Sequence, residues 1–536
     1  MGIYLNPDNN GFWESTRSEI YVDKTGLIAY TNRYMNTEQK YMCVSRPRRF
    51  GKSMTLKMLN AYYSCGCDSR DLFRGRKIEG DETFEKHLNR YDVIYLNMQQ
   101  FLIRARKQEV IEYLERVVVE DLREEYGDLF SETIMVLAEA FERIYVRTKR
   151  KFIFLVDEWD CVMRERQKSE ALQKQYLDFL RDLLKDQPYV ALAYMTGILP
   201  VKKYGQHSAL NMFTEYAMTD QRVLEEYTGF TEIEVKALCE RYDMDFTEMG
   251  SWYDGYMFRK FHHIYNPKSV VEAMLCQGFS NYWTSTEVYD ALKIYMDMDF
   301  DGLRSDIVHM LGGRHVTVNT RSFKNDMRTF ETKDDVLTLL VHLGYLAYDA
   351  ERKEAFIPNK EVLEEFENAM SVGGWTEVMR VLKASEKLLE DTLDGNAENV
   401  ADALDRAHTE VSSILTYNDE NSQSLADALS DKDLCAFIGL AYYSARKYYR
   451  FIREFPTGKG FADIVFLPLP HTDKPALVVE LKYGKTAETA LQQIKDRQYT
   501  QALEGYSGEI LLVGISYSRE NRDKAHSCVI ERILKR

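Results

Sequence analysis

The stretch Ser45–Ser53, with the sequence Ser-Arg-Pro-Arg-Arg-Phe-Gly-Lys-Ser, limits the possible folds of this chain more than any other segment. It follows a short apolar run, Tyr41–Val44, that is typical of a buried strand, and it leads into Met54–Leu59, which has the pattern of a helix start. A strand, a tight loop ending in Gly-Lys-Ser and a helix form the context of a phosphate-binding loop. In such a loop the backbone N–H groups and the helix N-terminus face the phosphates, Lys52 supplies a mobile charge and Ser53 supplies an oxygen ligand for Mg²⁺.

One position of this loop departs from the usual pattern G-x-x-x-x-G-K-[ST], because Arg46 occupies the place of the first glycine. A nucleotide site therefore needs support from elsewhere in the sequence. Together with Arg48 and Arg49, this residue also makes the loop more cationic than usual, so tight holding of a nucleotide is at least as reasonable an expectation as fast turnover.

The second half of a nucleotide site follows further along the chain. Five apolar residues, Phe152–Val156, have the pattern of a fully buried parallel strand, and Asp157 and Glu158 stand at its carboxyl end. Ligands of open α/β sheets bind at the carboxyl ends of the strands. We expect Asp157 to hold Mg²⁺, usually through water, and Glu158 to polarise the attacking water. A strand that ends in two acids is common by chance, but its place after a Gly-Lys-Ser loop favours the functional interpretation.

The run Tyr189–Met195 predicts a further strand, which ends in Thr196. Thr196 could sense a γ-phosphate from beside the acidic strand, or its hydroxyl could cap the next turn, and the sequence does not separate the two. The predicted cofactors are ATP and Mg²⁺, with Ser53 and Asp157 as metal ligands. The residues expected to contact the nucleotide are Arg46, Pro47, Arg48, Arg49, Phe50, Gly51, Lys52, Ser53, Met54, Asp157 and Thr196.

A chain of 536 residues needs several hydrophobic cores, and changes in sequence pattern divide it into five expected segments. Residues 1–223 carry the nucleotide site and an amphipathic helical excursion at 107–148. Within them Tyr21–Ile28 could close over a nucleotide base or simply pack on the sheet. The other segments are a helical lid region (224–331), a helix–hairpin–helix unit of winged-helix type (332–372), helical connectors (373–416) and a separate C-terminal domain (417–536).

Composition excludes several classes of protein. The formal net charge of −15 means that the chain is not a polycation that coats nucleic acid, so any such contact must come from a local basic patch. The eight cysteines are scattered, and no second pair joins Cys65 and Cys67 to complete a zinc site, which is typical of a reducing compartment. No leader pattern opens the chain, and no apolar run approaches the ~18 residues that span a bilayer. We therefore expect a cytoplasmic protein without membrane contact.

The last segment is predicted to be a small α/β domain with its own sheet. Its expected strands lie at 449–454, 461–467, 476–483 and 509–515, and its expected helices at about 422–445, at 486–502 and at the C-terminus.

Two carboxylates and a lysine can meet at the rim of this second sheet. Asp463 opens one expected strand, and Glu480 and Lys482, which share a strand face, end the next. A suitable register between the two strands brings Asp463 beside them. This set suits metal-assisted phosphodiester hydrolysis, in which Asp463 and Glu480 bind Mg²⁺ and Lys482 orients the water or stabilises developing charge. The alternative is a solvated pair of Glu480 and Lys482 at a sheet edge, although their strand is otherwise apolar.

The stretch 442–453, just before this sheet, interleaves four basic residues with five aromatic ones. Cations that neutralise phosphates and rings that stack on bases are what a nucleic-acid groove needs. A helix end packed on the sheet has the same composition, so both interpretations stay open.

Several motifs together resemble a bacterial architecture in which an AAA-like ATPase is fused to a C-terminal PD-(D/E)XK nuclease-like domain. They are Tyr21–Thr25, Arg46–Ser53, Val156–Asp160, Asp254–Tyr256 with Tyr265–Pro267, and Asp463 with Glu480–Lys482. The resemblance implies an AAA-like P-loop NTPase with a parallel sheet and a helical, winged-helix-like lid, followed by an α/β restriction-endonuclease-like domain. It also implies that an arginine at position 46 is a normal feature of this loop.

By this resemblance, Lys52, Ser53, Asp157 and Glu158 are the nucleotide and Mg²⁺ residues, and Asp463, Glu480 and Lys482 are the nuclease triad. Gln493 matches a glutamine that often follows the triad, and Glu420 matches an accessory metal ligand more loosely.

The function that these features favour is a nuclease regulated by nucleotide state, acting on nucleic acid and on DNA rather than RNA, and assembled as a homo-oligomer. A role in defence against mobile elements rests on analogy of fold. The alternative from another class is a signalling or assembly NTPase whose nuclease-like domain binds nucleic acid or protein without cutting it. A sequence-specific DNA-binding regulator is a weaker third possibility, because the winged-helix-like segment carries no basic recognition helix.

Overall fold

The computed structural model describes residues 2–105, 109–129, 136–201, 210–220, 222–283, 290–298, 300, 302–325, 327, 329–372, 374–416, 431–457, 460–469, 472–497, 503, 506, 508–518 and 525–534. The chain forms two compact units, each built from two stretches of sequence. The first comprises Met1–Trp283 and Val318–Pro358 and is called the ATPase unit here, after the activity that its sequence predicts. The second comprises Thr284–Thr317 and Asn359–Arg536 and is called the nuclease unit, after the predicted nuclease residues that it contains.

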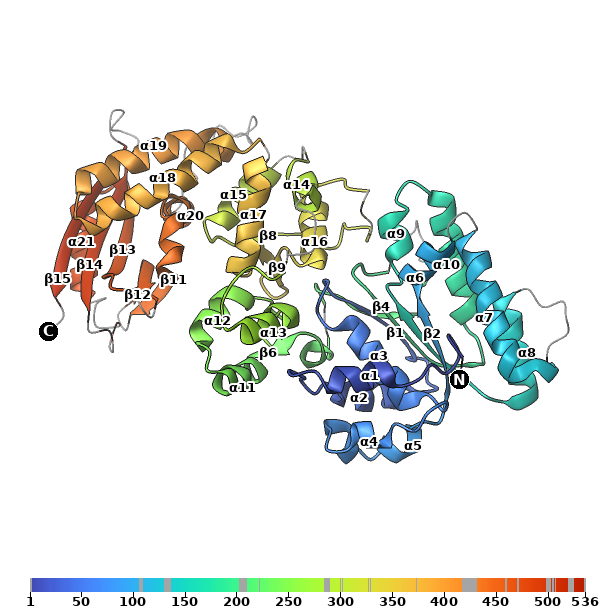
Figure 1. The fold of residues 1–536 in the computed structure, drawn as a ribbon. Coiled ribbons are helices and arrows are strands. Elements are labelled where there is room, and N and C mark those ends of the chain that lie inside the picture. Colours follow the sequence, from blue (N-terminus) through green and yellow to red (C-terminus); the bar gives the residue numbers. More distant parts are fainter. Residues whose placement is uncertain are drawn as a thin grey trace. The chain divides into compact units, whose positions relative to one another are not determined.

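A parallel sheet of five strands forms the centre of the ATPase unit (Figure 1). Its order is β2-β3-β4-β1-β5, and every neighbouring pair is parallel. The strands are β1 (Tyr41–Ser45), β2 (Asp92–Asn97), β3 (Phe152–Asp157), β4 (Val190–Gly197) and β5 (Thr214–Tyr216). The predicted parallel sheet is thereby confirmed. Because β1 and β3 both lie beside β4, the phosphate-binding loop after β1 and the acids at the end of β3 emerge at the same edge.

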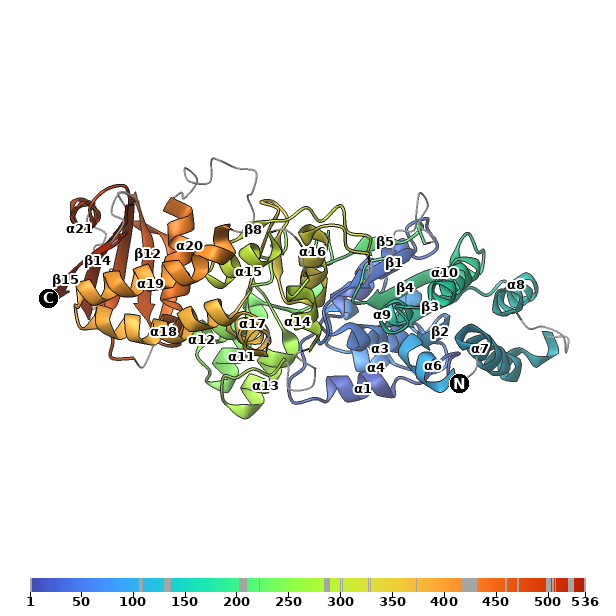
Figure 2. The same cartoon turned by 90° about the horizontal axis from the view of Figure 1, so that it is seen from above.

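Alternation along the strands separates two hydrophobic cores, one on each face of the sheet. On β3, Phe152, Phe154 and Val156 face one core, and Ile153 and Leu155 face the other. Helices cover both faces (Figure 2). One group is α6 (Met98–Ala105), α7 (Val110–Tyr126), α8 (Leu137–Thr148), α9 (Cys161–Glu165) and α10 (Glu170–Leu184), and the other includes α1 (Asn10–Thr16), α2 (Gly26–Tyr34) and α3 (Lys52–Tyr63). The expected excursion at 107–148 is thus the amphipathic pair α7 and α8.

A smaller helical module completes the ATPase unit. It consists of α11 (Glu232–Tyr242), α12 (Phe246–Tyr253) and α13 (Pro267–Cys276), with the short pair β6 (Phe230–Thr231) and β7 (Ile264–Tyr265). Ile20 and Val22 from the N-terminal segment pack into its core. The same unit holds α16 (Lys333–Leu343) and the hairpin of β9 (Ala347–Asp349) and β10 (Glu354–Phe356). The helix and hairpin expected near 332–358 are therefore present.

The nuclease unit is built on a second sheet of five strands, in the order β11-β12-β13-β14-β15. The strands are β11 (Tyr449–Thr457), β12 (Gly460–Pro468), β13 (Ala476–Tyr483), β14 (Glu509–Tyr517) and β15 (His526–Leu534). Only β13 and β14 run parallel among these neighbours, and α21 (Ala487–Asp496) lies between them in sequence. The helices α14 (Asp290–Met296), α15 (Leu303–Leu311), α17 (Lys360–Val372), α18 (Thr376–Leu393), α19 (Ala397–Thr416) and α20 (Asp431–Ala441) belong to this unit.

The expected C-terminal helix is wrong, because His526–Leu534 is the edge strand β15, antiparallel to β14 along its whole length. Val529 and Ile533, which pack on the core, are four residues apart. That spacing puts two side chains on one face of a helix and equally on one face of a strand, so periodicity alone could not decide. The edge of β14 favours the strand, because all nine residues of β14 are then paired in register with residues of β15.

No helix within the described ranges has both the length and the apolarity to cross a bilayer.

Two glycines allow α15 and α20 to touch backbone to backbone inside the nuclease unit. A Cβ added at Gly312, at the end of α15, would lie 2.2 Å from the carbonyl oxygen of Ala436. A Cβ added at Gly439 would lie 2.2 Å from the carbonyl oxygen of Gly312. In addition, Arg453 on β11 donates a hydrogen bond of 3.0 Å to the carbonyl of Gly313. The segment around α15 is therefore a structural part of the nuclease unit.

We predict that Gly312→Ala lowers the free energy of unfolding of the nuclease unit by about 2–3 kcal/mol, because the new methyl group meets backbone that cannot rotate away. Gly374→Ala is the matched control, since the only neighbour of its added Cβ within 4 Å is the flexible end of Arg304 at 3.8 Å. Urea unfolding of both variants measures the effect. Equal stability of the two variants would contradict the close approach of α15 and α20.

Candidate functional site

The phosphate-binding loop leads from β1 into α3 through a left-handed glycine. Gly51 has φ 84° at the N-cap of α3, a conformation that glycine adopts without strain, and a Cβ there would meet nothing within 4 Å. Lys52 is the first residue of the helix, and its buried ammonium group donates to the carbonyl oxygens of Arg46 (3.0 Å) and Pro47 (2.9 Å). Burial lowers the pKa of Lys52, against the attraction of Glu158 and other nearby acids. The lysine is thus folded back onto its own loop, within reach of an arriving phosphate.

Arg46 explains how the loop dispenses with its first glycine. Its side chain is fully buried, and it donates to Thr228 Oγ1 (2.6 Å) and to the carbonyl oxygens of Ser45 and Tyr216 (2.7 Å each). Burial lowers the pKa of Arg46 to about 9, so the group stays charged at neutral pH. The side chain points into the protein and does not line the nucleotide cavity. A contact of the Arg46 side chain with nucleotide is therefore not supported by its position, whereas its carbonyl holds the Lys52 ammonium group.

Two non-glycine residues at the site have left-handed backbone. Arg49, in the loop, has φ 69°, and Glu158, just after β3, has φ 52°. Such conformations are uncommon for side chains of this size and gather at functional sites. Arg49 is further fixed by a hydrogen bond of 2.8 Å from its guanidinium to the carbonyl of Tyr282.

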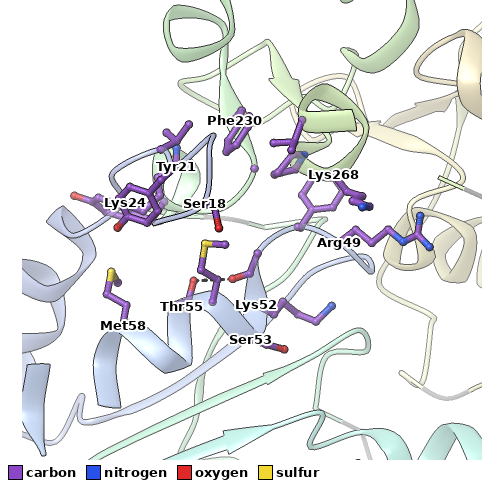
Figure 3. A pocket seen from close by; sticks show the side chains of 18 of the residues that line it. Ser18, Tyr21, Lys24, Arg49, Lys52, Ser53, Thr55, Met58, Phe230 and Lys268 are labelled. Carbon is purple, nitrogen blue, oxygen red and sulfur yellow. Dashed lines mark hydrogen bonds between the residues drawn. The ribbon is translucent and has the colours of Figure 1, made fainter. Parts of the chain in front are cut away.

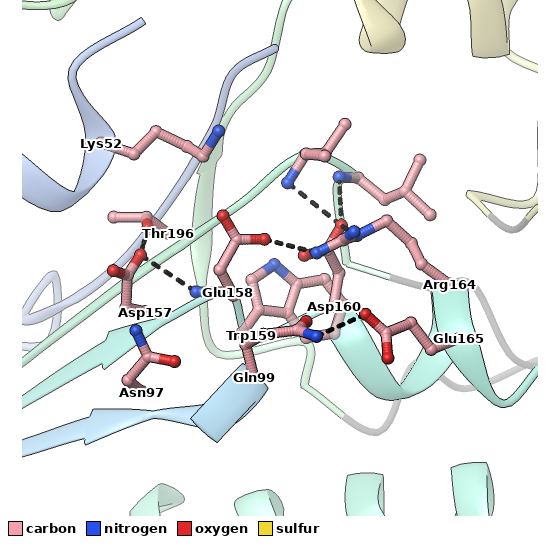
Figure 4. Close-up of polar contacts among 12 residues, drawn as sticks. Lys52, Asn97, Gln99, Asp157, Glu158, Trp159, Asp160, Arg164, Glu165 and Thr196 are labelled. Carbon is pink, nitrogen blue, oxygen red and sulfur yellow. Dashed lines mark hydrogen bonds and ion pairs between the residues drawn. The ribbon is translucent and has the colours of Figure 1, made fainter. Parts of the chain in front are cut away.

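Asp157 is held in place from two sides (Figure 4). Its Oδ1 accepts a hydrogen bond of 2.8 Å from the Thr196 hydroxyl on β4 and one of 3.1 Å from the N–H of Glu158. Asp157 and Thr196 are each only 1% exposed. The Thr196 hydroxyl therefore orients the expected metal ligand, a contact that neither of the two sequence-based alternatives described.

Glu158 is paired with an arginine that the sequence did not single out. Arg164, on α9, forms ion pairs with Glu158 and, at 3.0 Å, with Asp160 (Figure 4). Burial raises the pKa of Glu158, and the carboxylates of Asp160 and Asp157 act in the same direction, against Lys52 and Arg164. In the sequence, the only indication of this role was that Asp160 and Arg164 are four residues apart. Ion pairs at this spacing are so common on helices that the pair did not stand out.

A cavity of about 510 Å³ opens beside the loop and α3 (Figure 3). Of the predicted residues, Arg48, Arg49, Phe50, Gly51, Lys52, Ser53, Met54 and Glu158 line it, whereas Pro47, Asp157 and Thr196 do not. Its apolar wall comes from the N-terminal segment (Ile20, Tyr21 and Val22) and from the helical module (Phe230 and Val271). The start of the segment at 21–28 therefore faces the cavity, while Leu27 and Ile28 pack in the core on the sheet. Phe230 and Lys268 were missed, because only tertiary packing brings the module here.

An ion pair joins the two walls of this cavity. Lys24, beside the N-terminal wall, pairs with both carboxylate oxygens of Glu234 on α11 at 2.6 and 2.8 Å, and it also donates to the carbonyl of Glu226. Both side chains are less than one-fifth exposed. The cavity size is within the usual range for small-molecule sites, and its combination of an apolar wall with a cationic helix start suits a nucleotide base and its phosphates.

The second centre brings three of the predicted nuclease residues together on β12 and β13. Asp463 Oδ2 accepts a hydrogen bond of 2.8 Å from the N–H of Leu481, and Lys482 Nζ lies 2.8 Å from Glu480 Oε1. Ile464 pairs with Val479 in the antiparallel register, which puts Asp463 beside Glu480. Gln493, on α21, donates to Glu480 Oε1 as well. Glu420 lies outside the described residues.

Glu480 is the most deeply buried group of this centre, with 1% exposure. Burial, together with the nearby Asp463 carboxylate, raises the pKa of Glu480 to about 7, against the effect of Lys482. Within the described residues its Oε2 has no hydrogen-bond partner, and no group of three or more His, Cys, Asp or Glu side chains is gathered for a metal. Two carboxylates, one with an unsatisfied buried oxygen, nevertheless fit a hard cation such as Mg²⁺, which binds through few protein oxygens and keeps several waters.

Several aromatic residues of the stretch at 442–453 pack into the unit, whereas Lys447 and Arg450 are exposed. Tyr442, Tyr443 and Tyr449 are buried, and the Tyr442 hydroxyl lies 2.7 Å from that of Thr392. The Arg446 guanidinium lies over the rings of Tyr443 (5.0 Å) and Phe451 (5.6 Å). Of the two interpretations of this stretch, these contacts favour the packed helix end.

Two family models match the chain. The family described as predicted AAA-ATPase matches residues 14–206, and the PD-(D/E)XK nuclease superfamily matches residues 435–527. An uncharacterized protein in the vnfD 5′ region of Azotobacter chroococcum mcd 1 is 23% identical over 530 residues, which cover 94% of this chain and 93% of that protein.

Similar solved structures include the Walker-type ATPase of Pyrococcus abyssi, at 12% identity and a TM-score of 0.35, covering 66% of this chain and 97% of that one. The ORC2 protein of Aeropyrum pernix is 10% identical with a TM-score of 0.23, covering 68% of this chain and 99% of that one.

The two matched regions contain the two sites. The phosphate-binding loop and Glu158 lie in the first region, and Asp463, Glu480, Lys482 and Gln493 lie in the second. The chain therefore joins an AAA-ATPase-like domain in its N-terminal part to a PD-(D/E)XK nuclease superfamily domain in its C-terminal part.

Proposed function

We propose that the protein binds and hydrolyses ATP, and that its nucleotide state regulates a Mg²⁺-dependent nuclease in its C-terminal unit. The observation that carries the proposal is the set Asp463, Glu480, Lys482 and Gln493, in which a buried carboxylate oxygen is left available to a cation. The substrate is a nucleic acid phosphodiester, with DNA favoured over RNA.

At the ATP site, each residue has a separate task. The start of α3 and Lys52 bind the phosphates, Ser53 and Asp157 hold Mg²⁺, and Glu158 takes up the proton of the attacking water. The Thr196 hydroxyl keeps Asp157 in one orientation. The apolar wall around Tyr21, Val22 and Phe230 excludes water from the base.

At the nuclease site, Asp463 and Glu480 would hold Mg²⁺, which when bound polarises the phosphodiester. Lys482 neutralises charge that develops on the phosphate and restrains Glu480 at 2.8 Å. Gln493 fixes the same carboxylate from α21.

The protein acts as a homo-oligomer in this proposal, because ATPases of this type often borrow an arginine from a neighbouring subunit. Defence against mobile elements is the pathway that fits a nuclease under nucleotide control.

A second candidate function is an NTPase for signalling or assembly, whose nuclease-like domain binds nucleic acid or protein without cutting. The observation in its favour is that burial raises the pKa of Glu480 to about 7, so a proton competes with a metal ion for this carboxylate at neutral pH. The inward packing of the stretch at 442–453 also leaves fewer cations for a nucleic-acid surface.

At the ATP site we predict that Lys52→Ala weakens ATP binding by roughly 10–100-fold, because it removes the cation at the phosphates. Glu158→Gln lowers turnover by about 100-fold or more and changes binding by less than about twofold, because it removes only the proton acceptor. Titration with a fluorescent nucleotide and phosphate-release assays measure both. Lys57→Ala and Glu165→Gln, both exposed, are the matched controls. Turnover that survives both Lys52→Ala and Glu158→Gln would refute the ATPase assignment.

At the nuclease site, Glu480→Ala and Lys482→Ala should each reduce cleavage of labelled DNA by roughly 100-fold or more in Mg²⁺ or Mn²⁺. The assay includes labelled RNA and is run with and without ATP. Lys485→Ala serves as the control, because Lys485 is exposed and lies three residues beyond Lys482. Cleavage that both variants leave unchanged would refute the nuclease assignment, and its absence in the native protein would favour the binding-only alternative.

Metal binding at this site should depend on pH, because a proton on Glu480 competes with the cation. With a pKa of about 7, the carboxyl is largely protonated at pH 6 and largely ionised at pH 8. We therefore predict that the affinity for Mn²⁺ is about tenfold lower at pH 6 than at pH 8. Calorimetric titration of nucleotide-free protein measures it, and Glu480→Gln should abolish the dependence. The same affinity at both pH values in the native protein would count against Glu480 as a ligand.

A further inference from the structure

Arg164 has no part in the phosphate-binding loop or in the acidic strand, yet it is built into the ATP site. It lies six residues after Glu158, on α9, and only 8% of its side chain is exposed. Its guanidinium bridges two carboxylates, pairing with Glu158 through one nitrogen and with Asp160 through another. A buried cation between two acids is costly to assemble unless each group is held in place, so its position calls for a reason.

We infer that Arg164 is a positioning residue for ATP hydrolysis, which fixes the carboxylate of Glu158 at the nucleotide cavity. The inference deepens the proposed ATPase function and rests on it.

The anchor of this arrangement is Asp160. It is fully buried, and its Oδ2 accepts hydrogen bonds from the backbone N–H groups of Ile198 (3.0 Å) and Leu199 (2.8 Å) in addition to Arg164. Those two N–H groups follow directly after β4, so Asp160 is tied to the sheet itself. At Gly197 an added Cβ would lie 2.7 Å from Asp160 Oδ1, which indicates how closely the backbone passes this carboxylate. The guanidinium of Arg164 thus rests on a support that cannot move independently of β4.

Hydrogen bonds fix the backbone of Glu158, whose N–H donates to Asp157 Oδ1 and whose carbonyl accepts from the N–H of Cys161, but they do not fix its carboxylate. The residue stands in a left-handed conformation after the strand has ended, and its long side chain reaches into the cavity. Arg164 does not line that cavity, whereas Glu158 does. This placement fits a residue that acts on Glu158 better than one that contacts the phosphates directly.

The other charged groups around Glu158 do not duplicate this role. Lys52 points to the loop carbonyls of Arg46 and Pro47. Asp157 and Asp160 repel the Glu158 carboxylate, and Lys52, Arg48 and Arg164 attract it. Among the described residues, Arg164 alone forms a direct ion pair with the Glu158 carboxylate. The planar guanidinium of arginine can bridge two carboxylates, and the single ammonium group of lysine bridges them less well. Lysine at position 164 is therefore expected to restore the function of Arg164 only in part.

The test compares Arg164→Met, Arg164→Lys and the exposed control Arg166→Met in the full chain. We expect Arg164→Met to lower kcat for ATP by roughly 10–100-fold and to change KM and the Kd for nucleotide by less than about twofold, since only the geometry of the proton acceptor is lost. Arg164→Lys should recover part of kcat, and Arg166→Met should resemble the native protein. In a Glu158→Gln background, Arg164→Met should cause no further loss, because its target is already gone.

Several outcomes would overturn the inference. An unchanged or increased kcat in Arg164→Met would mean that Arg164 is dispensable or restrains the enzyme. A parallel loss of nucleotide affinity would assign it to phosphate binding, and an additive loss on top of Glu158→Gln would separate it from Glu158. If Arg164→Met does not fold, as judged by its thermal midpoint, Arg164→Lys and its double variant with Glu158→Gln give the same comparison. Native protein without turnover would refute ATP hydrolysis and this role together, whereas active native protein with a normal Arg164→Met variant would refute this role alone.

Discussion

The buried guanidinium of Arg46 is the constraint on which the nucleotide site depends. A charge that is 0% exposed is stable only where dipoles surround it, and the carbonyls of Ser45 and Tyr216 with the Thr228 hydroxyl provide them. These partners belong to the loop itself, to the end of β5 and to the segment before β6. One side chain therefore fixes the start of the phosphate-binding loop against the sheet and the helical module, which a glycine at this position could not do. With arginine in place of the usual glycine, the start of the loop is therefore more rigid.

The two candidate sites share one arrangement, in which a glutamate is paired with a basic neighbour; Glu480 is buried and Glu158 is partly buried. Glu158 is paired with Arg164, and Glu480 with Lys482. In both cases burial favours the neutral carboxyl, and the cation restores part of the charge. The partners differ in kind: Arg164 is itself anchored by a second acid, Asp160, whereas Lys482 lies on the same strand as the glutamate that it pairs with.

Local pattern was enough to predict the elements that carry the chemistry. Short apolar runs predict β1, which leads to the loop with Lys52, and β3, which ends at Asp157; both pair with β4 in parallel. Similar runs predict the strands β12 and β13, whose antiparallel pairing brings Asp463 to Glu480. The partners of these residues could not be predicted in the same way. Arg164, the contact of Thr196 with Asp157 and the cavity wall at Phe230 depend on tertiary packing. The C-terminal segment, predicted as a helix, is the strand β15, and the four-residue spacing of its core contacts fits both structures.

The order in which the chain leaves the ribosome has a consequence for these two units. Synthesis passes from the ATPase unit to the nuclease unit and back before it ends in the latter, because 284–317 and 318–358 belong to different units. All residues of the ATPase unit have been made once synthesis reaches residue 358, but α15 must wait for α20 before the backbone contact at Gly312 can form. A single cut after residue 358 keeps every residue of the ATPase unit but removes 284–317 from the nuclease unit, so an isolated nuclease unit should be designed as a spliced chain rather than a truncation.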